Sequence, residues 1–529
     1  HVRRGGGLIT GGLGWGWLQL NPERTIQQHP GNQLLGAFGV LWADGTLKKT
    51  TGEGFKLRRD ELENAHAGHA LQAVERCASQ PADAGDGAQL AQAVGVVAHA
   101  LRTTPPDDRF LRPRLASLRM SHPEPIVPSE KHPVTLKTPI ARLLLTMELE
   151  ELRRTPPERL RAHPAAESFP GAPPADAATV RRTIEIDCRV PDWHSTGLYA
   201  PPGRLIRVEL PASAVSVGLR VRIGAHKDRL WHKAAWKRCP EITVAAPLDA
   251  EEVSLANAFG GLIYVVVPRN APAETTHVSI DGGIAAPHFV LGRTSRDEWL
   301  QRRLAPAPWA ELESSKIIVT VPAELVRELD DPAAVMQTWD AIADADARLA
   351  GIPTTRARPE RFVADRQISA GYMHAGYPIM THLDAAAAMV SDEKLRAGNW
   401  GLFHELGHNH QSPDWTFGGT GEVTCNLFTL YVYETVCGQY ETSRPQLFGD
   451  ARVETIRKHL AAGASFDAWK RDPFLALLMY MQLKEAFGWE AFQRVFAEYR
   501  DLPPGDRPRD DAEKRDQWLI RFSRAAGKN

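Results

Sequence analysis

One short segment of the sequence combines two histidines and a glutamate at a spacing that suits metal chemistry. It reads GLFHELGHNHQ and contains the pattern H-E-x-x-H. On a helix, His404 and His408 lie one turn apart on the same face, so both imidazoles can bind one Zn²⁺. Glu405 lies beside them and can take a proton from a water on the metal. The pattern predicts a hydrolytic zinc site.

A catalytic zinc site usually has three protein ligands and one open position, and the sequence offers two candidates for the third. Asp414 follows His408 by six residues, but the peptidase class with that spacing needs a glycine where this chain has Gln411. Glu422 follows His408 by fourteen residues, after a glycine-rich turn, and opens an apolar helix. We expect Glu422 to be the third ligand, with Asp414 as the alternative. Glu434 is too far along that helix to bind the same ion.

Other residues close to the motif have supporting roles in this prediction. Asn426, one turn after Glu422, can hydrogen-bond a ligand or the substrate. His410 is expected outside the ligand set. The competing interpretation is a surface helix whose His and Glu only pair with each other, but this gives no reason for a second helix to present Glu422 after a glycine turn.

Hydrolysis of a carbonyl compound also needs a donor for the oxyanion, and aromatic side chains could contact the substrate. The glycine-rich sequence GYMHAGYP supplies His374, Tyr372 and Tyr377 as candidate donors, although packing accounts for each of them equally well. Trp400 and Trp415 flank the motif, and an indole can stack on a sugar ring. A core position is the favoured interpretation for both tryptophans.

The catalytic block must be positioned by the rest of the chain, which begins with two less informative regions. Residues 1–110 combine glycine-rich turns, the short apolar runs Leu8–Ile9 and Leu34–Val40, and a helix-favouring stretch at 88–101, as in an incomplete α/β unit. The sequence GGLGWG is a poor match to a dinucleotide-binding loop and is taken as a close-packed turn. Residues 111–178 are expected to hold a helix at 138–153 and a proline-rich connector.

The next two blocks differ in their periodicity. Residues 179–295 alternate apolar and polar residues in short runs separated by turn residues, which predicts a β-sandwich. The strands are expected at 183–186, 205–210, 219–223, 241–244, 262–267 and 277–280. Residues 296–529 are expected to form a mainly α-helical zincin domain that begins with a strand at 317–321. Its helices are expected at 332–349, 392–397, 400–411, 421–436, 452–461 and 474–487.

Composition excludes several classes of protein. The 529 residues suggest about three domains at ~100–200 residues each, and the net charge of −1 gives no field to attract nucleic acid. The five cysteines form no C-x-x-C pair, so no zinc ribbon or dense disulfide framework is predicted. No apolar run reaches the ~18–20 residues of a membrane span. Both ends of the chain read as cut, the last one inside a helix, and no signal peptide is visible.

The motifs resemble those of a known family. FHELGHNHQ, WTFGGTGEVTCNL and GYMHAGYPIM are similar to the enhancin-like zinc metallopeptidases, metallopeptidase family 60, and most similar to the branch with the TRP-channel-associated factors. The family pattern, H-E-x-x-H followed by a glutamate, falls on His404, Glu405, His408 and Glu422. TGLYAPPG resembles the start of the β-sandwich that precedes such gluzincin-type domains. The N-terminal block resembles the truncated glutamine-amidotransferase-like domain of this branch, to which we assign no activity.

This resemblance implies a zinc-dependent endopeptidase that cuts O-glycosylated, mucin-like proteins next to a glycosylated Ser or Thr. The implied partners are the glycoprotein substrate and Zn²⁺, with no nucleic acid, and the implied location is secreted or periplasmic. The alternative is a non-catalytic interaction protein that retains a metal site. A third interpretation, an intracellular aminopeptidase, lacks the expected G-x-M-E-N sequence. The glycan recognised and the oligomeric state are not predicted.

Overall fold

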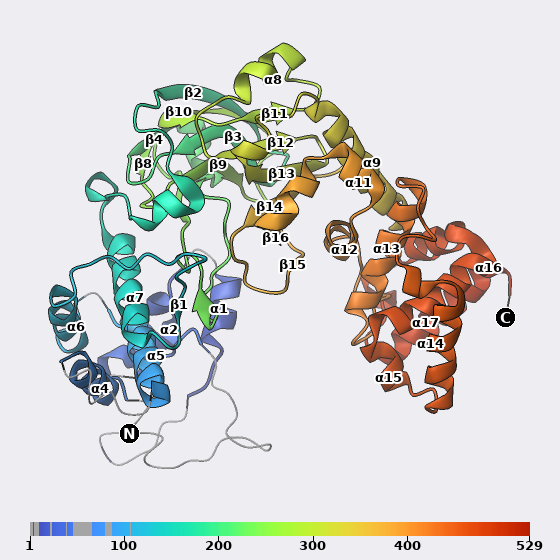
Figure 1. Cartoon of the computed structure of the whole chain (residues 1–529), viewed down its shortest axis with the longest axis horizontal. Coiled ribbons are helices and arrows are strands. Elements are labelled where there is room, and N and C mark those ends of the chain that lie inside the picture. Colours follow the sequence, from blue (N-terminus) through green and yellow to red (C-terminus); the bar gives the residue numbers. More distant parts are fainter. Residues whose placement is uncertain are drawn as a thin grey trace. The chain divides into compact units, whose positions relative to one another are not determined.

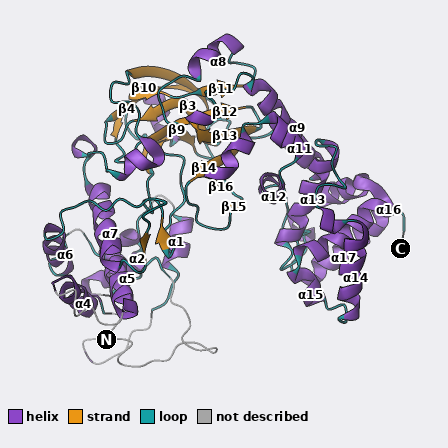
Figure 2. Cartoon of the chain, in the orientation of Figure 1, coloured by secondary structure: helices purple, strands orange, loops and turns teal. Residues whose placement is uncertain are grey.

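The computed structural model of the chain describes residues 4, 10–21, 24–38, 40–45, 66–79, 87–105 and 107–528. These residues form two compact units. The first contains the described part of His1–Ser168 together with Arg229–Glu241, and the second contains Phe169–Asp228 and Ile242–Asn529. Figure 1 labels the elements, and Figure 2 separates helices from strands. The segment Arg229–Glu241 lies in the middle of the expected β-sandwich, so its grouping with the first unit was not foreseen.

The first unit is built from helices around one apolar core. Helices α4, α5, α6 and α7 meet through buried leucines and valines such as Leu71, Val97, Leu115 and Leu143. The helix predictions for 88–101 and 138–153 are confirmed by α5 and α7. The elements of this unit are α1 (Gly14–Leu20), α2 (Pro30–Leu35), α4 (Ala67–Ser79), α5 (Gly87–Thr103), α6 (Leu111–Met120), β1 (Val134–Thr135), α7 (Pro139–Arg154) and β6 (Ala235–Trp236).

This helical unit differs from the α/β unit expected for residues 1–110. In the described part of that range every regular element is a helix, and the expected amidotransferase-like arrangement is not seen there. The apolar run that starts at Leu34 continues α2, which begins at Pro30 and is capped by the His29 side chain accepting from the Gly31 amide. The run Leu8–Ile9 lies outside the described residues.

The second unit begins with one antiparallel eight-stranded sheet, which lies where the sequence predicted a β-sandwich. Seven strands follow the order β7-β5-β9-β3-β10-β4-β8, and β2 pairs with β10. Buried residues of β2, β3, β4, β5, β9 and β10 share a single apolar core, so the sheet folds over on itself. The strands are β2 (Thr179–Asp187), β3 (Asp192–Ala200), β4 (Ile206–Glu209), β5 (Arg220–Ile223), β7 (Val244–Pro247), β8 (Glu252–Leu255), β9 (Gly261–Val267) and β10 (Thr275–Ala285).

The long strand β10 makes this folding-over possible. Its register shifts between Ile280 and Gly283, so its centre pairs with β4 while its end pairs with β3. Gly282 has a φ of +90°, and a Cβ there would lie 2.6 Å from the carbonyl oxygen of Leu205. Only glycine satisfies both conditions, and the strand can therefore bend at this point.

A second sheet in residues 288–382 was largely missed, and the mainly helical prediction for residues 296–529 is therefore only partly right. Its strand order is β11-β12-β13-β14-β16-β15, and β13, β14 and β16 run parallel. Helix α9 (Pro332–Leu349) connects β13 to β14, as a parallel pair requires. The strands are β11 (His288–Val290), β12 (Trp309–Glu313), β13 (Ile317–Pro322), β14 (Glu360–Asp365), β15 (Met373–His374) and β16 (Ile379–His382).

Helices complete this domain after β16. The predicted 474–487 helix continues to Arg500 through a kink at Gly488, whose φ is +75°. The last helix, expected to run on past the end, stops at Ala526 because Gly527 adopts the left-handed conformation. Helix α8 (Arg296–Arg302) precedes β12. The helices after β16 are α10 (Ala386–Met389), α11 (Asp392–Ala397), α12 (Trp400–His408), α13 (Gly421–Thr435), α14 (Gly449–Ala461), α15 (Phe466–Arg471), α16 (Pro473–Arg500) and α17 (Asp511–Ala526).

A buried ion pair within the second sheet contacts the first sheet through hydrogen bonds. Arg361 on β14 pairs with Glu311 on β12, and both side chains are almost fully buried. Glu311 also accepts from the Tyr264 hydroxyl of β9 at 3.0 Å, and Arg361 donates to Ser195 Oγ of β3 at 3.0 Å. Since both members of the pair also form hydrogen bonds across the boundary, the pair fixes the second sheet against the sandwich.

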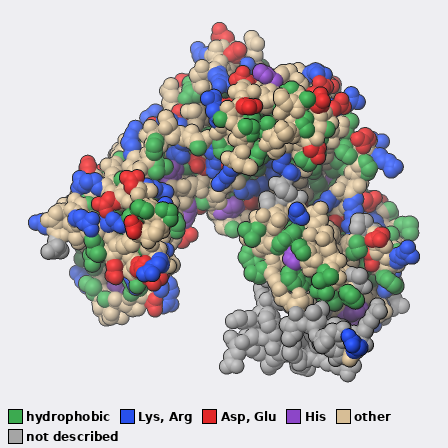
Figure 3. Space-filling model, turned by 180° about the vertical axis from the view of Figure 1, so that it is seen from behind, with side chains coloured by type: hydrophobic (Ala, Val, Ile, Leu, Met, Phe, Trp, Pro, Cys, Tyr) green, Lys and Arg blue, Asp and Glu red, His purple; other side chains and the backbone are tan. Residues whose placement is uncertain are grey.

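The surface charges and the helix lengths do not indicate a nucleic-acid partner or a membrane-spanning helix among the described residues. On the face of the molecule shown in Figure 3, Lys and Arg side chains are interspersed with Asp and Glu, in line with the net charge of −1. Among the described residues, no helix has the length and apolar character needed to cross a bilayer.

Candidate metal centre

Helix α12 carries the histidine pair. The Asn399 side chain caps its start by accepting from the Leu402 amide at 3.1 Å. Leu402, Phe403 and Leu406 are fully buried. The opposite face of the helix carries His404 and His408, which are partly exposed. The helix predicted for 400–411 is thus confirmed as far as His408.

Helix α13 brings the third donor to these histidines. Its residues from Val423 to Tyr433 are all buried, so the helix lies inside the domain. It passes α12 at very short range, since a Cβ on Gly407 would lie 2.6 Å from the carbonyl oxygen of Cys425. This close approach places Glu422, in the first turn of α13, beside His404 and His408.

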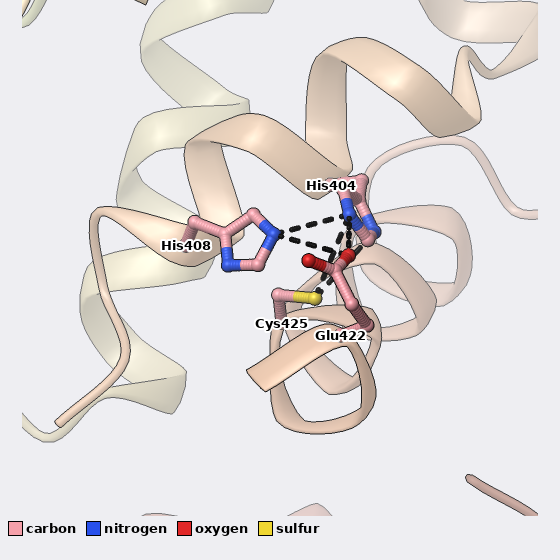
Figure 4. Close-up of side chains that lie close together, drawn as sticks. All are labelled: His404, His408, Glu422 and Cys425. Atoms are coloured by element: carbon pink, nitrogen blue, oxygen red, sulfur yellow. Dashed lines mark hydrogen bonds and ion pairs between the residues drawn. The ribbon is translucent and has the colours of Figure 1, made fainter. Parts of the chain in front are cut away.

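The three side chains converge on one point (Figure 4). His404 Nε2 lies 3.0 Å from Glu422 Oε2, His408 Nε2 lies 3.5 Å from the same oxygen, and the two Nε2 atoms are 3.1 Å apart. A tetrahedral zinc ion with ligand distances of about 2.0–2.1 Å separates its ligand atoms by about 3.3 Å. The donor set therefore has the size and the chemistry that suit Zn²⁺.

Two carboxamides fix the protonation of the histidines. His404 Nδ1 donates to Asn426 Oδ1 at 2.7 Å, and His408 Nδ1 donates to Gln411 Oε1 at 2.7 Å. The amide nitrogens of Asn426 and Gln411 donate to the carbonyls of Glu422 and Gly421, which orients both oxygens toward the imidazoles. With Nδ1 protonated, each neutral ring presents the Nε2 lone pair to the shared point, as a metal ligand must.

Glu405 follows the first histidine and is buried to 8% exposure. Burial raises the pKa of Glu405, and the nearby histidines only partly offset this rise. Its carboxylate therefore binds a proton more readily than an exposed glutamate does. This property suits a general base beside a metal.

His374 is held near this carboxylate by a residue of the sandwich. His374 Nε2 lies 2.7 Å from Asp228 Oδ2, and the same oxygen accepts from the Ser369 amide at 2.6 Å. Burial disfavours the charged imidazole, but the hydrogen bond and charge of Asp228 outweigh this effect and raise the pKa of His374. The charge of His374 acts on Glu405 in turn.

The two candidate tyrosines, Tyr377 and Tyr372, pack against other side chains. The Tyr377 ring packs 3.9 Å from the Arg358 guanidinium and against Trp193 of the sandwich. Tyr372 is exposed and stacks on His382 at 5.6 Å between ring centroids. Burial, together with Asp384, raises the pKa of Tyr372 to about 12. Both tyrosine rings therefore have packing partners of their own.

The core position favoured for Trp415 is confirmed, and its candidate substrate role is wrong. The Trp415 indole is fully buried and stacks on Phe496 of α16 at 4.3 Å between ring centroids. The apolar surface of the ring packs better against α16 than it would against water, so it belongs to the core. Trp400 is partly buried against Tyr433 and Phe474.

The alternative ligands lie outside the cluster. Asp414 pairs with Arg507 at 3.6 Å, and Glu434 accepts from Trp489 and pairs with Lys484. Within the described residues, the group that could hold a metal consists of His404, His408, Glu422 and Cys425.

Sequence reasoning missed three residues of this region. Cys425 Sγ lies 3.5 Å from His404 Nδ1, and its position three residues after Glu422 on one helix could have revealed it. Asn409 hydrogen-bonds both the amide and the carbonyl of Gly376, which ties the loop of His374 to α12. Asp228 has no signal in the sequence, since it is 146 residues from His374.

Comparisons with known proteins place this geometry in context. Residues 282–529 match the family described as peptidase M60, enhancin and enhancin-like, and residues 175–281 match the N-terminal domain of M60-like peptidases. TRPM8 channel-associated factor 2 of Bos taurus is 37% identical over 551 residues, which include all of this chain and 58% of the relative. The chain thus spans a little more than half the length of this relative.

Solved structures share the fold. The IMPa metallopeptidase from Pseudomonas aeruginosa aligns with a TM-score of 0.54 at 16% identity, covering 95% of this chain and 63% of that one. The structure of IMPa in complex with an O-glycopeptide gives the same TM-score and identity over 92% of this chain and 61% of that one.

Proposed function

Over residues 175–529 this chain belongs to the M60 peptidase family, and from this premise we propose that it is a zinc-dependent endopeptidase. Its substrates are O-glycosylated, mucin-like proteins, cut next to a glycosylated Ser or Thr. The observation that carries the proposal is the convergence of His404 Nε2, His408 Nε2 and Glu422 Oε2 within 3.5 Å of one another, with Glu405 beside them.

His404, His408 and Glu422 would hold the metal. A zinc ion at this point supplies Lewis-acid activation of water and of the scissile carbonyl. Three protein donors leave the fourth tetrahedral position for a reactant. The exposure of the Glu422 side chain, 64%, supports access from solvent to that position.

The chain's own groups then handle protons and charge. Glu405 takes the proton of the attacking water and passes it to the leaving amine, a role that its raised pKa favours. His374 donates a hydrogen bond to the carbonyl oxygen as negative charge develops there. The charge of Asp228 keeps this imidazole protonated over a wider pH range.

Strand β15 provides a place for the substrate backbone. It is the edge strand of its sheet, and Met373 on β15 packs against Gly401 of α12. An extended peptide can add to such an edge by main-chain hydrogen bonds, which would carry it across the metal helix. An endopeptidase needs this kind of open edge, because both ends of its substrate must extend beyond the site.

The glycoprotein substrate is inferred from the family. One structural neighbour, IMPa from Pseudomonas aeruginosa, has been solved in complex with an O-glycopeptide. A secreted or periplasmic location would fit such a substrate. The test compares cleavage of an O-glycosylated peptide with that of its bare counterpart, and measures bound zinc, for the wild type and for Glu405→Ala. The variant should keep the metal and lose about 10²–10⁴-fold in turnover, and equal cutting of both peptides would reject the glycan requirement.

A second candidate function is a non-catalytic interaction protein with a closed metal site. Two observations favour it: a relative at 37% identity is named a channel-associated factor, and Cys425 supplies a fourth donor within 4.8 Å of the other three. Four protein ligands would leave no position for a reactant. Cys425→Ser separates the candidates, since the peptidase keeps its zinc affinity and its turnover, whereas a closed site loses affinity.

A further inference from the structure

The loop at residues 224–228, which follows β5, contacts the catalytic domain and holds the segment that carries His374. Two adjacent residues of this loop make the contacts. Lys227 Nζ donates to the carbonyl of Tyr377 at 2.6 Å, and Asp228 Oδ2 contacts both His374 Nε2 and the Ser369 amide. The segment 369–377 is therefore held at its start, its middle and its end.

The contact between Asp228 and His374 is largely buried. Asp228 is only 6% exposed, whereas the His374 side chain is 23% exposed, and the charge of His374 lowers the pKa of Glu405. Burial alone would raise the pKa of the Asp228 carboxyl, but its hydrogen bonds with His374 and Ser369 bring that pKa down to about 2. Asp228 is thus an anion throughout the physiological range, and the energetic cost of burying it is offset mainly by His374.

Because Nε2 is engaged with Asp228, the other ring nitrogen matters for the reaction. His374 Nδ1 lies 3.1 Å from the carbonyl of Ala375, a contact with the neighbouring residue that a substrate oxygen can replace. A ring without Asp228 could flip or lose its proton. A ring that is hydrogen-bonded through Nε2 keeps a single orientation and stays protonated.

We propose that Asp228 is a positioning residue of the peptidase, and that the sandwich domain is thereby part of the catalytic machinery. Asp228 orients the imidazole of His374 and holds it protonated, so that His374 can stabilise the oxyanion. This inference rests on the proposed function, since it assigns a residue to the same reaction. Lys227 contributes by fixing the far end of the segment, next to Tyr377.

The experiment uses the full chain loaded with zinc, with Asp228→Asn, Asp228→Glu, His374→Ala and the double variant Asp228→Asn/His374→Ala. A matched control is Asp187→Asn, which removes a partly exposed aspartate of the same sandwich that pairs with Arg189. For each we measure kcat and KM on an O-glycosylated peptide, bound zinc, the melting temperature, and the titration of the His374 imidazole by NMR. Asp228 and Ser369 contact this imidazole, and the charges of Lys227 and Glu405 interact with it.

We expect Asp228→Asn to lower kcat about 10–100-fold with little change in KM or bound zinc, a loss of the size seen when a group that orients a catalytic side chain is removed. The NMR midpoint of His374 should fall, and Asp228→Glu should recover part of both effects. In the His374→Ala background, Asp228→Asn should have no further effect on kcat. Asp187→Asn should leave all values unchanged.

Two results would overturn the inference. One is an Asp228→Asn variant that keeps wild-type kcat although its His374 midpoint has fallen. The other is a loss of kcat that is equally large with and without His374, which would show a structural role only. Failure of the proposed function looks different, because the wild type itself would then release no product from the glycopeptide.

Discussion

Arg356 donates a hydrogen bond from Nη2 to Nε2 of His410 over 2.8 Å, two residues after the end of the helix that carries His404 and His408. The other ring nitrogen of His410 donates to the carbonyl of Leu406 at 2.7 Å. Since Nε2 accepts and Nδ1 donates, the imidazole must be neutral. Burial, reinforced by the charge of Arg356, lowers the pKa of His410 to about 3.

This relationship predicts acid sensitivity. In the unfolded chain the pKa of a histidine is near 6.5. Below that pH the histidine of the unfolded state is protonated, whereas His410 in the folded state stays neutral. The free energy of unfolding should therefore fall by about 2 kcal/mol between pH 7 and pH 5 through this residue. Urea unfolding at both pH values, for the wild type and for His410→Gln, measures the difference. An equal decline in both proteins would contradict the pKa assignment.

The close approach of α12 and α13 should be essential for metal binding. Gly407→Ala places a Cβ 2.6 Å from the Cys425 carbonyl, so the helices must move apart and Glu422 must move away from the histidines. We expect zinc affinity to fall at least tenfold, by competition with a chelator. Gly421→Ala is the matched control, because nothing lies within 4 Å of a Cβ at that position. Comparable losses in the two variants would rule out this explanation.

The carboxamide of Asn426, which hydrogen-bonds His404, should raise the affinity for zinc. Asn426→Ala removes the acceptor at His404 Nδ1, and loss of such a partner typically lowers metal affinity 10–100-fold. Asn426→Asp retains an acceptor there and should keep most of the affinity. Calorimetric zinc titration of the three proteins tests this order, and a wild-type affinity in Asn426→Ala would show that the hydrogen bond does not matter.

The buried ion pair of Glu311 and Arg361 in the second sheet should matter for stability. Glu311→Ala leaves the Arg361 guanidinium buried without its anion, which we expect to lower the free energy of unfolding by about 3–5 kcal/mol. Asp330→Ala is the control, because its ion pair with Arg303 is largely exposed on the aspartate side and should contribute at most about 1 kcal/mol. Denaturant titration distinguishes the two, and a small loss in Glu311→Ala would mean that water or another group replaces the carboxylate.

The sequence predicts features that depend on residues close together in the chain better than features that depend on residues far apart in it. Helices α9, α11 and α13 follow the predicted limits closely, because caps such as Asp331 and apolar periodicity are local signals. The convergence of His404, His408 and Glu422 was predicted for the same reason. It needs only two consecutive helices and the turn between them.

Non-local features were missed. Strand β3 was not recognised because Gly197, with a φ of +65°, interrupts its alternation at a register shift between Ser195 and Tyr199. Strands β14 and β16 are short and buried, so their patterns do not differ from those of a buried helical turn. Trp415 could be placed only after α16, some eighty positions later in the chain, was seen to cover it.

The loop that contains Lys227 and Asp228 also has a practical consequence for anyone expressing parts of this protein. The boundary between the two matched family domains falls at residue 282, so a gene fragment that starts there would encode every proposed metal ligand. Such a fragment would omit the contacts that Lys227 and Asp228 make with the segment from Ser369 to Tyr377. It could take up zinc and still hydrolyse poorly, and adding the missing sandwich as a separate polypeptide would be the natural attempt at complementation.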